Sequence, residues 1–331
     1  MAFDVVPTVP GEAAAQPQRT GDGIEVSINT DEAEWRHLME LAPVGHMPQD
    51  YSFAAGKLAS GWPSRRLLLS SGGRPVAFAV VLELRRAGLR LFNRINRGPI
   101  LLDPNPSDQQ VIGVFRALRN SVGRFWTAPL LIAPALPRTD RNIALLREAG
   151  YIRRQVASWR SGRIDLSGSE DELWRSFSPT FRNRARASER AGAELRIAED
   201  AAGYEWMIAR HIENMQAKNF RAANPRLLRG LREAAPGNVL VFQLLREGVP
   251  VAGMSVVRFG RVAEYHVGWF GPEGREVNAG NFLMWNVMRE MRRRGVTVFD
   301  VGGLREGDGY TQFKRTMRPV EYELAGEWIS L

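Results

Sequence analysis

The chain has 331 residues, a formal net charge of +9 and 44% hydrophobic residues, which is the composition of a globular protein and not of a disordered one. Its length is enough for two domains that each bury a core. The absence of cysteine excludes disulfides, thiolate metal sites and a cysteine nucleophile, and no apolar stretch has the length of a membrane span.

The histidines and the basic residues bear on which metals or partners the protein could bind. The four histidines are scattered without His-x-x-x-His spacing, so we expect no metal site. The positive charge leaves two interpretations open: a mixed solvated surface, or binding of an anionic partner such as nucleic acid, a phosphorylated substrate or an anionic membrane face. The first residues lack the layout of a secretion signal, which is compatible with the cytoplasm.

The N-terminal residues 1–23 are rich in Gly, Pro, Ala and Gln, and this composition predicts a disordered tail. Order is expected to begin at the alternating strand IEVSI, residues 24–28. The following DEAEWRHLMELA, residues 31–42, is helical in pattern.

A repeat of one unit organises most of the remaining chain. Residues 65–84 and 239–258 both show a strand, a short turn, a Pro-Val-Ala triplet and a second strand. The elements that follow agree in order, which predicts a tandem duplication of an α/β unit with mixed sheets. The first copy continues through strand 89–102, helix 108–122 and strand 128–136, and the second through strand 262–270, helix 279–295 and strand 296–303.

An arginine-rich helical segment separates the copies. Residues 172–199 are broken at Ser178-Pro179, and the arginines that follow spread around much of the helix circumference. Two interpretations stay open, a solvated helix or a helix that faces phosphate or RNA. These arginines are Arg182, Arg184, Arg186 and Arg190.

Several motifs resemble the FemABX family, which has two tandem GNAT acyltransferase domains. DYSFAAGKLASGW (50–62) is similar to its Trp-x-x-x-Lys-x-x-x-Gly-Trp region, with Phe53 in place of the tryptophan. NRGPILL (96–102) resembles its Arg-Gly-Pro turn, and residues 173–196 resemble its linker and helix. The most specific match is residues 281–317, with helix, Asp-x-Gly-Gly and Phe-Lys, although FKRTMRP lacks the Phe-Gly that often follows.

The resemblance implies two GNAT-like domains. The first would cover residues 24–164 and the second residues 165–319. The last segment, 320–331, alternates like a strand and would return to the first domain, as in the family. Members transfer an amino acid from aminoacyl-tRNA to the side-chain amine of a peptidoglycan precursor.

Catalytic residues follow from the resemblance and from the chemistry of aminoacyl transfer. Attack of an amine on an aminoacyl ester forms a tetrahedral oxyanion, which a positioned cation stabilises. The resemblance assigns this role to Lys314, one of three lysines among 45 Lys and Arg residues, with Phe313 packed against the site. Asp300 ends a predicted strand and would orient either the Gly-Gly turn or a substrate amine. A general base is not required, since the ribose hydroxyl can receive the amine proton.

Binding residues are implied by the same motifs. Lys57 lies where the resemblance implies contact with the phosphates of the precursor, and Lys218 and Arg221 lie in a segment that resembles a second precursor-binding region. Trp269 and Tyr310 are candidate pocket aromatics, for which core packing is the alternative.

The loops that precede the two central helices indicate whether CoA could be the acyl donor. A CoA-dependent GNAT domain has glycines and a basic residue before the helix that holds the pyrophosphate. The second copy reads EVNAGNFLMW with one glycine before the helix, and the first reads LDPNPSDQQV with two prolines, which lack N–H donors. Both loops would serve CoA poorly.

Three functions remain open at this stage. The first is a FemABX-like aminoacyltransferase that takes aminoacyl-tRNA as co-substrate, uses no cofactor, and acts on lipid II, a UDP-muropeptide or a similar amine, in the cytoplasm and with peripheral contact to the inner membrane face. The second is an acyl-CoA-dependent GNAT N-acyltransferase of polysaccharide or lipid modification. The third is a non-catalytic RNA- or membrane-binding module, which would tolerate the loss of Lys314.

Overall fold

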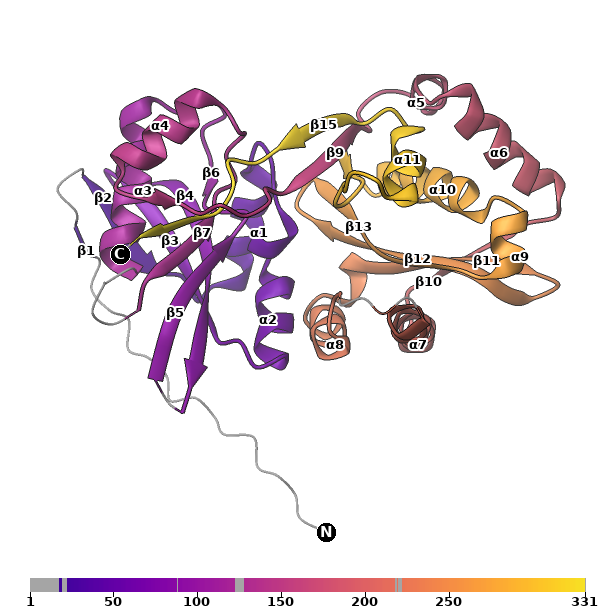
Figure 1. The fold of residues 1–331 in the computed structure, drawn as a ribbon, viewed down its shortest axis with the longest axis horizontal. Coiled ribbons are helices and arrows are strands. Elements are labelled where there is room, and N and C mark those ends of the chain that lie inside the picture. The colour runs from indigo at the N-terminus through magenta and orange to yellow at the C-terminus, as the bar shows by residue number, and fades with distance from the viewer. Residues whose placement is uncertain are drawn as a thin grey trace, which may run out of the picture.

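The computed structural model describes residues 18–19, 23–87, 89–122, 128–217, 219 and 222–330. They form two mixed β-sheets, each with its own helices, which lie side by side along the longest axis of the molecule (Figure 1). The predicted pair of α/β units is therefore present. Most of the predicted tail, residues 1–23, lies outside the described residues, and within it Gln18–Arg19 pair with the first long strand.

The first sheet carries the N-terminal half of the chain. Its strands follow the order β1-β2-β3-β4-β5-β7-β16-β8, and β6 pairs with β4 beside this path. Within it β5 and β7 run parallel. The strands are β1 (Gln18–Arg19), β2 (Ile24–Ile28), β3 (Ser64–Ser71), β4 (Arg74–Arg86), β5 (Leu89–Asn96), β6 (Ile100–Leu101), β7 (Leu130–Ala133), β8 (Ile152–Arg153) and β16 (Trp328–Ser330).

The second sheet repeats this arrangement. Its strands follow the order β10-β11-β12-β13-β14-β9-β15, and β13 and β14 are the parallel pair. The strands are β9 (Arg160–Asp165), β10 (Glu194–Ala198), β11 (Val239–Arg246), β12 (Val249–Phe259), β13 (Val262–Phe270), β14 (Val298–Asp300) and β15 (Val320–Glu323).

The two sheets exchange strands at the chain's connections, and the strand assignment differs here from the domain limits expected from sequence. β9 begins at Arg160, before the expected limit at residue 165, and already belongs to the second sheet. Of the segment 320–331, only β16 joins the first sheet, where it pairs with β7 and β8, while β15 pairs with β9 in the second. The chain therefore crosses between the sheets twice.

The helices cover the sheets on both faces. Predicted helices at 31–42, 108–122 and 279–295 are present, and Ser178 caps the helix that begins at Pro179, at the expected break. No helix within the described ranges has the length and hydrophobicity to cross a bilayer. The helices are α1 (Glu32–Leu41), α2 (Tyr51–Ala59), α3 (Asp108–Val122), α4 (Asp140–Glu148), α5 (Glu170–Ser176), α6 (Pro179–Arg190), α7 (Ala201–Ala217), α8 (Pro225–Ala234), α9 (Pro272–Glu276), α10 (Ala279–Arg293), α11 (Gly309–Arg315) and the 3-10 turns η1 (Met47–Gln49) and η2 (Pro236–Asn238).

One hydrophobic core is shared by the two halves. It joins α1, α2 and one face of β4 to α7, α8 and the facing side of the second sheet. Helices α2 and α8 cross at two glycines: a Cβ on Gly230 would lie 3.0 Å from the Cα of Gly56. Larger side chains at this crossing would push the helices apart. The shared core and this close crossing pack the two halves as one body.

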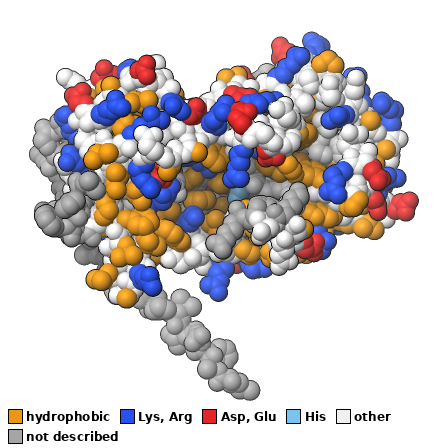
Figure 2. Space-filling view, viewed as in Figure 1, with side chains coloured by type: hydrophobic (Ala, Val, Ile, Leu, Met, Phe, Trp, Pro, Cys, Tyr) orange, Lys and Arg blue, Asp and Glu red, His pale blue; other side chains and the backbone are white. Residues whose placement is uncertain are grey.

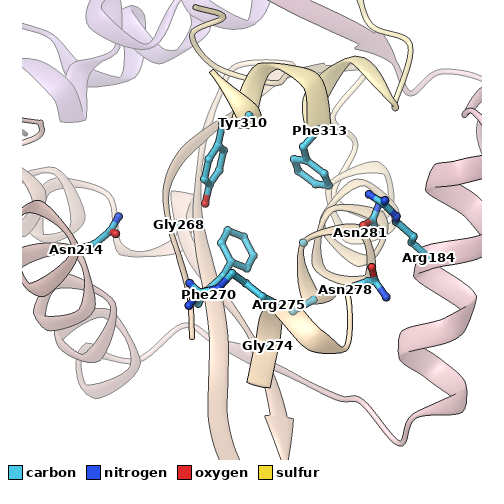
Figure 3. A pocket seen from close by; sticks show the side chains of 13 residues that line it. Arg184, Asn214, Gly268, Phe270, Gly274, Arg275, Asn278, Asn281, Tyr310 and Phe313 are labelled. Carbon is cyan, nitrogen blue, oxygen red and sulfur yellow. Dashed lines mark hydrogen bonds between the residues drawn. The ribbon is translucent and has the colours of Figure 1, made fainter. Parts of the chain in front are cut away.

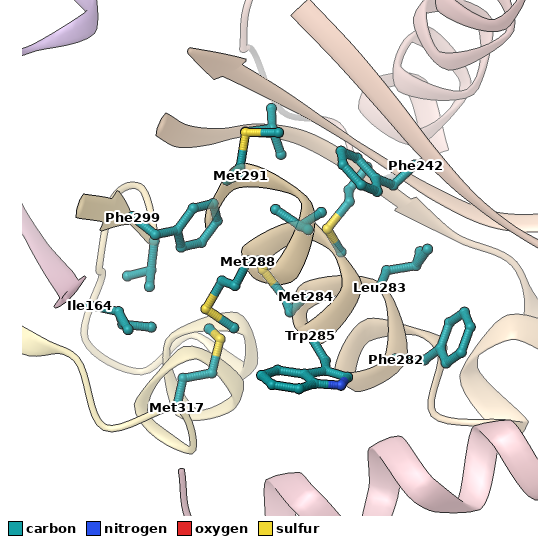
Figure 4. Packing of buried hydrophobic residues seen from close by; sticks show 14 of the residues in the cluster. Ile164, Phe242, Phe282, Leu283, Met284, Trp285, Met288, Met291, Phe299 and Met317 are labelled. Carbon is teal, nitrogen blue, oxygen red and sulfur yellow. The ribbon is translucent and has the colours of Figure 1, made fainter. Parts of the chain in front are cut away.

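The other face of the second sheet packs against α10. The buried residues of α10 lie on most of its circumference, because α6, α11 and the sheet surround it. Met284, Met288 and Met291 fill the space between the helix and the strand that carries Phe299 (Figure 4). Unbranched methionines adapt to such irregular spaces. This core fixes α10 and α11 relative to β14.

Candidate active site

Lys314 is buried inside the second half. It lies on α11, whose first turn is capped by Asp308, and its side chain is 5% exposed. Its Nζ donates a hydrogen bond to the carbonyl oxygen of Gly303 at 2.9 Å. The same atom lies 5.2 Å from the centre of the Tyr265 ring, within the range of a cation–π contact. One ammonium N–H is thus engaged, and the other two have no acceptor among the described residues.

The lysine lies where the parallel strands β13 and β14 part. Their pairing ends at Glu264 and Asp300. Beyond that point a Cβ on Gly302 would come within 2.8 Å of the carbonyl oxygen of Tyr265, and Gly302 has φ +72, a conformation that favours glycine. The glycine turn therefore passes close to both Tyr265 and the Lys314 ammonium, whose Nζ would lie 3.7 Å from that Cβ.

Burial changes the acidity of this ammonium. Desolvation lowers the pKa of Lys314 from 10.5 to about 8, and the negative charges of Asp300 and Asp308 oppose the shift. At neutral pH the group is therefore still mostly protonated. A cation with little solvent around it interacts more strongly with a developing negative charge than one in water.

Asp300 is buried beneath the glycine turn with both carboxylate oxygens occupied. Oδ1 accepts hydrogen bonds from Ser161 Oγ and, at 2.9 Å, from the backbone N–H of Gly302, and Oδ2 accepts one from the Tyr322 hydroxyl at 2.7 Å. Arg163 lies 3.7 Å from Oδ2. Of the two roles considered for Asp300, this arrangement favours orientation of the turn over contact with a substrate amine.

An ion pair joins the first half to this region. The Arg97 guanidinium lies 3.0 Å from Oε2 of Glu264, the last residue of β13 that pairs with β14, and both side chains are buried. Burial raises the pKa of Glu264, and the positive charge of Arg97 opposes that shift. Arg97 also stacks on Trp159, with 4.3 Å from its Cζ to the ring centre. The Arg-Gly-Pro turn of the first half therefore reaches the site in the second.

A first pocket, called here the α10 pocket, opens at the N-terminus of α10 and has a volume of about 290 Å³. Tyr310 and Phe313 of α11 point into it and face Phe270 of β13 (Figure 3). Arg184 and Asn281 lie across the pocket from Phe270, near Phe313 (Figure 3). Tyr310 shares a side-chain hydrogen bond with Tyr265, the ring beside Lys314. The predicted pocket aromatic Tyr310 thus lies between this pocket and the lysine.

The N-terminus of α10 is open toward this pocket. Asn278, its N-cap residue, has φ +57 and makes no side-chain capping bond. Asn281 is 4% exposed, and its Nδ2 has no hydrogen-bond partner among the described residues. Free backbone N–H groups, a buried unpaired amide and Arg184 together suit a polar or anionic group.

A second pocket, called here the interdomain pocket, lies between the halves and has a volume of about 670 Å³. Arg97, Trp159 and Gly303 are among the residues that line it, and Gly303 is the partner of Lys314. Both chain crossings contribute to its wall, the first just before β9 and the second between β15 and β16. Residues at the lysine thus reach two separate pockets, through Gly303 on one side and Tyr310 on the other.

The remaining predicted residues lie apart from Lys314. Lys57 is on α2 in the first half, with Nζ 5.4 Å from the Phe53 ring centre and 5.9 Å from that of Trp62, and desolvation lowers its pKa. Trp269 is on the opposite face of the second sheet, packed at 5.8 Å against Trp206 of α7. Lys218 and Arg221 lie outside the described residues.

Sequence reasoning missed three polar residues in β13. Glu264, Tyr265 and His266 interrupt a strand that is otherwise mainly apolar, and this interruption was the available signal. His266 is the extra residue of a β-bulge, its Nδ1 has no partner among the described residues, and burial lowers its pKa to about 4. Bulges often redirect side chains near active sites.

Comparison with family models finds a match in the second half of the chain. Residues 175–315 match the family described as an acetyltransferase (GNAT) domain. This span contains α10, β14 and Lys314. No curated protein matches the chain in sequence.

Solved structures extend the likeness to both halves. A crystal structure of FemX aligns with a TM-score of 0.79 and 15% identity, over 92% of this chain and 96% of that one. A tandem GNAT protein from the clavulanic acid biosynthesis pathway aligns at 0.54 with 15% identity, over 93% and 98%. L-PGS from Bacillus licheniformis aligns at 0.52 with 12% identity, over 91% of each chain. The chain therefore has the tandem GNAT fold that FemX has, and the resemblance stated from its motifs is confirmed at the level of the fold.

Proposed function

We propose that this protein is an aminoacyltransferase of the FemABX type. It moves an amino acid from aminoacyl-tRNA to an amine of a peptidoglycan precursor, lipid II or a UDP-muropeptide, or of a similar acceptor. The observation that carries the proposal is the buried ammonium of Lys314, whose neighbours reach two separate pockets. A transferase has to hold a donor and an acceptor on either side of the reacting carbonyl.

The proposed reaction needs a cation and no cofactor. The acceptor amine attacks the ester carbonyl, a C–N bond forms, and the carbonyl oxygen becomes negative. Lys314 stabilises this oxyanion with its free N–H donors while Gly303 holds the third. Collapse then breaks the ester C–O bond, and the ribose hydroxyl leaves with the proton that the amine loses.

Asp300 acts in this proposal as a positioning residue. Its carboxylate holds the N–H of Gly302, and the next residue, Gly303, presents the carbonyl that orients Lys314. Phe313 and Tyr310 line the α10 pocket on the same helix as the lysine. In this arrangement the α10 pocket takes the aminoacyl end of the donor and the interdomain pocket takes the acceptor amine.

The acceptor's phosphates are assigned by the family resemblance to Lys57, Lys218 and Arg221. The position of Lys57 supports a binding role, because its ammonium lies between two aromatic rings and has no carboxylate partner among the described residues. A cation without a counter-ion is suited to a phosphate. Trp269, on the face of the second sheet that packs against α7, remains a candidate residue for contact with the acceptor.

An acyl-CoA-dependent N-acyltransferase is the second candidate. The open N-terminus of α10 and the unpaired amide of Asn281 favour it, because they offer donors to a diphosphate. Against it stands the loop before α10, which has a single glycine between Val277 and the helix's third residue. The two candidates share Lys314 and differ in the donor.

Label transfer separates the candidates. Purified protein receives radiolabelled aminoacyl-tRNA in one reaction and radiolabelled acetyl-CoA in another, each with UDP-muropeptide, lipid II or a cell extract as acceptor. We expect label to leave tRNA for the acceptor, and Lys314→Met to lower the rate about 10²–10³-fold. Gln312→Met, an exposed change on the same helix, is the matched control and should keep full activity. Transfer from acetyl-CoA alone would establish the second candidate.

A further inference from the structure

An exposed apolar surface lies at one end of the first half. Leu89 and Leu91 of β5 are 70% and 46% exposed, and Leu58 in the last turn of α2 is 57% exposed. Trp62 and Phe92 connect the two elements, with ring centres 6.3 Å apart. Figure 1 places the end of α2 and β5 at the lower edge of this half, and Figure 2 shows hydrophobic side chains gathered there. We call these five residues the tip surface.

Leu89 and Leu91 are exposed for a local reason. The pairing of β4 with β5 shifts at Leu84 and Arg85, so that Leu91 is the extra residue of a bulge without a partner across the hairpin. Leu89 pairs with Arg86 in the last register before the turn, beyond the body of the sheet. Neither leucine belongs to the hydrophobic cores of the fold. Their exposure therefore serves no packing purpose within the chain.

The tip surface is surrounded by positive charge. Between Asp50 and Asp103 the only acidic residue is Glu83. This one carboxylate is shared by three arginines, with nitrogen–oxygen distances of 2.8 Å to Arg65, 2.6 Å to Arg85 and 3.4 Å to Arg90. Arg86 is exposed and contacts no carboxylate among the described residues. The charges at this end are therefore largely uncompensated.

We propose that the tip surface docks on a lipid bilayer with anionic headgroups. Exposed leucines can enter the boundary between headgroups and acyl chains, tryptophan favours that interface, and arginines attract the negative surface. A protein partner fits less well, because leucine is scarce among the residues that dominate protein interfaces, and arginines of one sign without acids offer no charge pattern to match.

The second half provides an internal comparison. Its corresponding hairpin, β12–β13, buries Val262, the first residue of its second strand. The neighbouring hairpin, β11–β12, exposes Val249 to 61% but carries the acidic Glu247 in the turn. Among the described residues, only the first half combines several exposed leucines with uncompensated arginines. Lys57, proposed to contact the acceptor's phosphates, lies 5.9 Å from the Trp62 ring at this same end. Docking would therefore bring a lipid-linked acceptor to the enzyme, and in that respect the inference extends the proposed function.

Vesicle binding tests the surface independently of catalysis. The full chain is sedimented with vesicles of phosphatidylcholine mixed with phosphatidylglycerol, and with vesicles of phosphatidylcholine alone. We expect binding to the mixed vesicles, weakened at high salt, and little binding to the neutral ones. We expect the double variant Leu89→Asp/Leu91→Asp to bind the mixed vesicles at least about tenfold more weakly than the unchanged protein. The single variant Arg86→Glu should lose binding to a similar extent. Val249→Asp, a comparably exposed aliphatic residue on the β11–β12 hairpin, should bind like the unchanged protein.

Several outcomes would overturn the proposal. Equal binding to neutral vesicles, no binding to either, or equal losses in the Val249→Asp and leucine variants would each do so. A loss confined to Arg86→Glu would show a site for polyanions in which the leucines have no part. A change of oligomeric state in the leucine variants, seen by light scattering without lipid, would assign the surface to a second copy. Label transfer to a water-soluble acceptor reports on the proposed function separately, since the tip variants keep the residues around Lys314.

Discussion

The two halves repeat one unit but differ at the position of the candidate site. In the second half, the helix after the parallel strand is α11, and it turns Lys314 toward Gly303, just beyond the end of the β13–β14 pairing. In the first half, the helix after the parallel strand is α4, and it turns the buried Leu145 and Leu146 inward. The same backbone plan thus encloses a charged group in one copy and an apolar core in the other.

The helices that follow the central strands differ in the same way. At the start of α3, Ser107 caps the first turn by accepting a hydrogen bond from the N–H of Gln110 at 3.2 Å, and two prolines precede it. At the start of α10, no side chain caps the helix and Asn281 has an unpaired amide. One helix end is capped from within the chain, whereas the other has no side-chain cap among the described residues. The fold tolerates both, because the cores beneath them are independent.

The largest effect is expected where the halves are joined. Arg97→Met would leave Glu264 buried without its cation and lower the free energy of unfolding by about 3–5 kcal/mol. The double variant Arg97→Met/Glu264→Met should recover most of that loss. Urea denaturation followed by fluorescence measures both. Arg86→Met, an exposed arginine without a carboxylate, is the control and should change the free energy of unfolding by less than about 0.5 kcal/mol. Equal losses for the two single variants would contradict the ion pair's importance.

Asp300→Asn tests whether the glycine turn positions Lys314. An amide cannot accept all the hydrogen bonds that the carboxylate receives, so we expect kcat/KM to fall about tenfold or more. Because Asp300 also raises the pKa of Lys314, the variant's activity should decline at lower pH than that of the unchanged protein. Tyr322→Phe removes one of these bonds and keeps the charge, so its pH profile should not move. Identical profiles for all three proteins would show that Asp300 is structural only.

The pH dependence follows from the burial of Lys314. With a pKa of about 8, the lysine loses its proton as pH rises through that value, so kcat/KM should be level below pH 7 and fall about tenfold per unit well above pH 8. Lys314→Arg, slower but always charged, should lack this decline. A rise in activity above pH 8 would instead indicate a neutral amine acting as base.

The free energy of unfolding should change with pH in the direction opposite to activity, because Lys314 is buried. The folded pKa lies below the unfolded value of 10.5, so burying the ammonium destabilises the fold below pH 8, and this cost is relieved as pH rises from 8 to 10.5. Lys314→Met should therefore be at least as stable as the unchanged protein at pH 7. An inactive but stable variant distinguishes a catalytic loss from an unfolded protein. A marked fall in stability would assign the lysine a structural role.

The smallest expected effect is on the KM for the donor. It is tested by matched variants at the starts of α10 and α3. Asn281→Leu removes an unpaired amide from the α10 pocket, so we expect a several-fold rise in KM for the donor with no loss of stability. Gln110→Leu, at the third residue of α3 as Asn281 is of α10, should leave KM unchanged. Equal effects of both changes would remove the distinction between the two helix ends.

The sequence by itself determined the repeat and most of the strands and helices within it, and it led to Lys314 as the candidate catalytic residue. These properties are local: alternation predicts strands, a 3.6-residue period predicts helices, and residues 281–317 carry their motif without interruption. The helix break at Ser178-Pro179 was equally readable, because proline is favoured in the first turn after a serine cap. Phe313 and Tyr310 followed, since they share a short helix with the lysine.

Only the tertiary structure decided what comes together from distant parts of the chain. The exchange of β9 and β16 between the sheets, the pairing of Arg97 with Glu264 and the support of Gly302 by Asp300 join residues whose sequence separation carries no periodic signal. It also placed Trp269 on the face opposite Lys314, because a strand alternates its sides and the bulge at His266 changes that alternation. Register and bulges depend on both partner strands, which one segment's sequence does not contain.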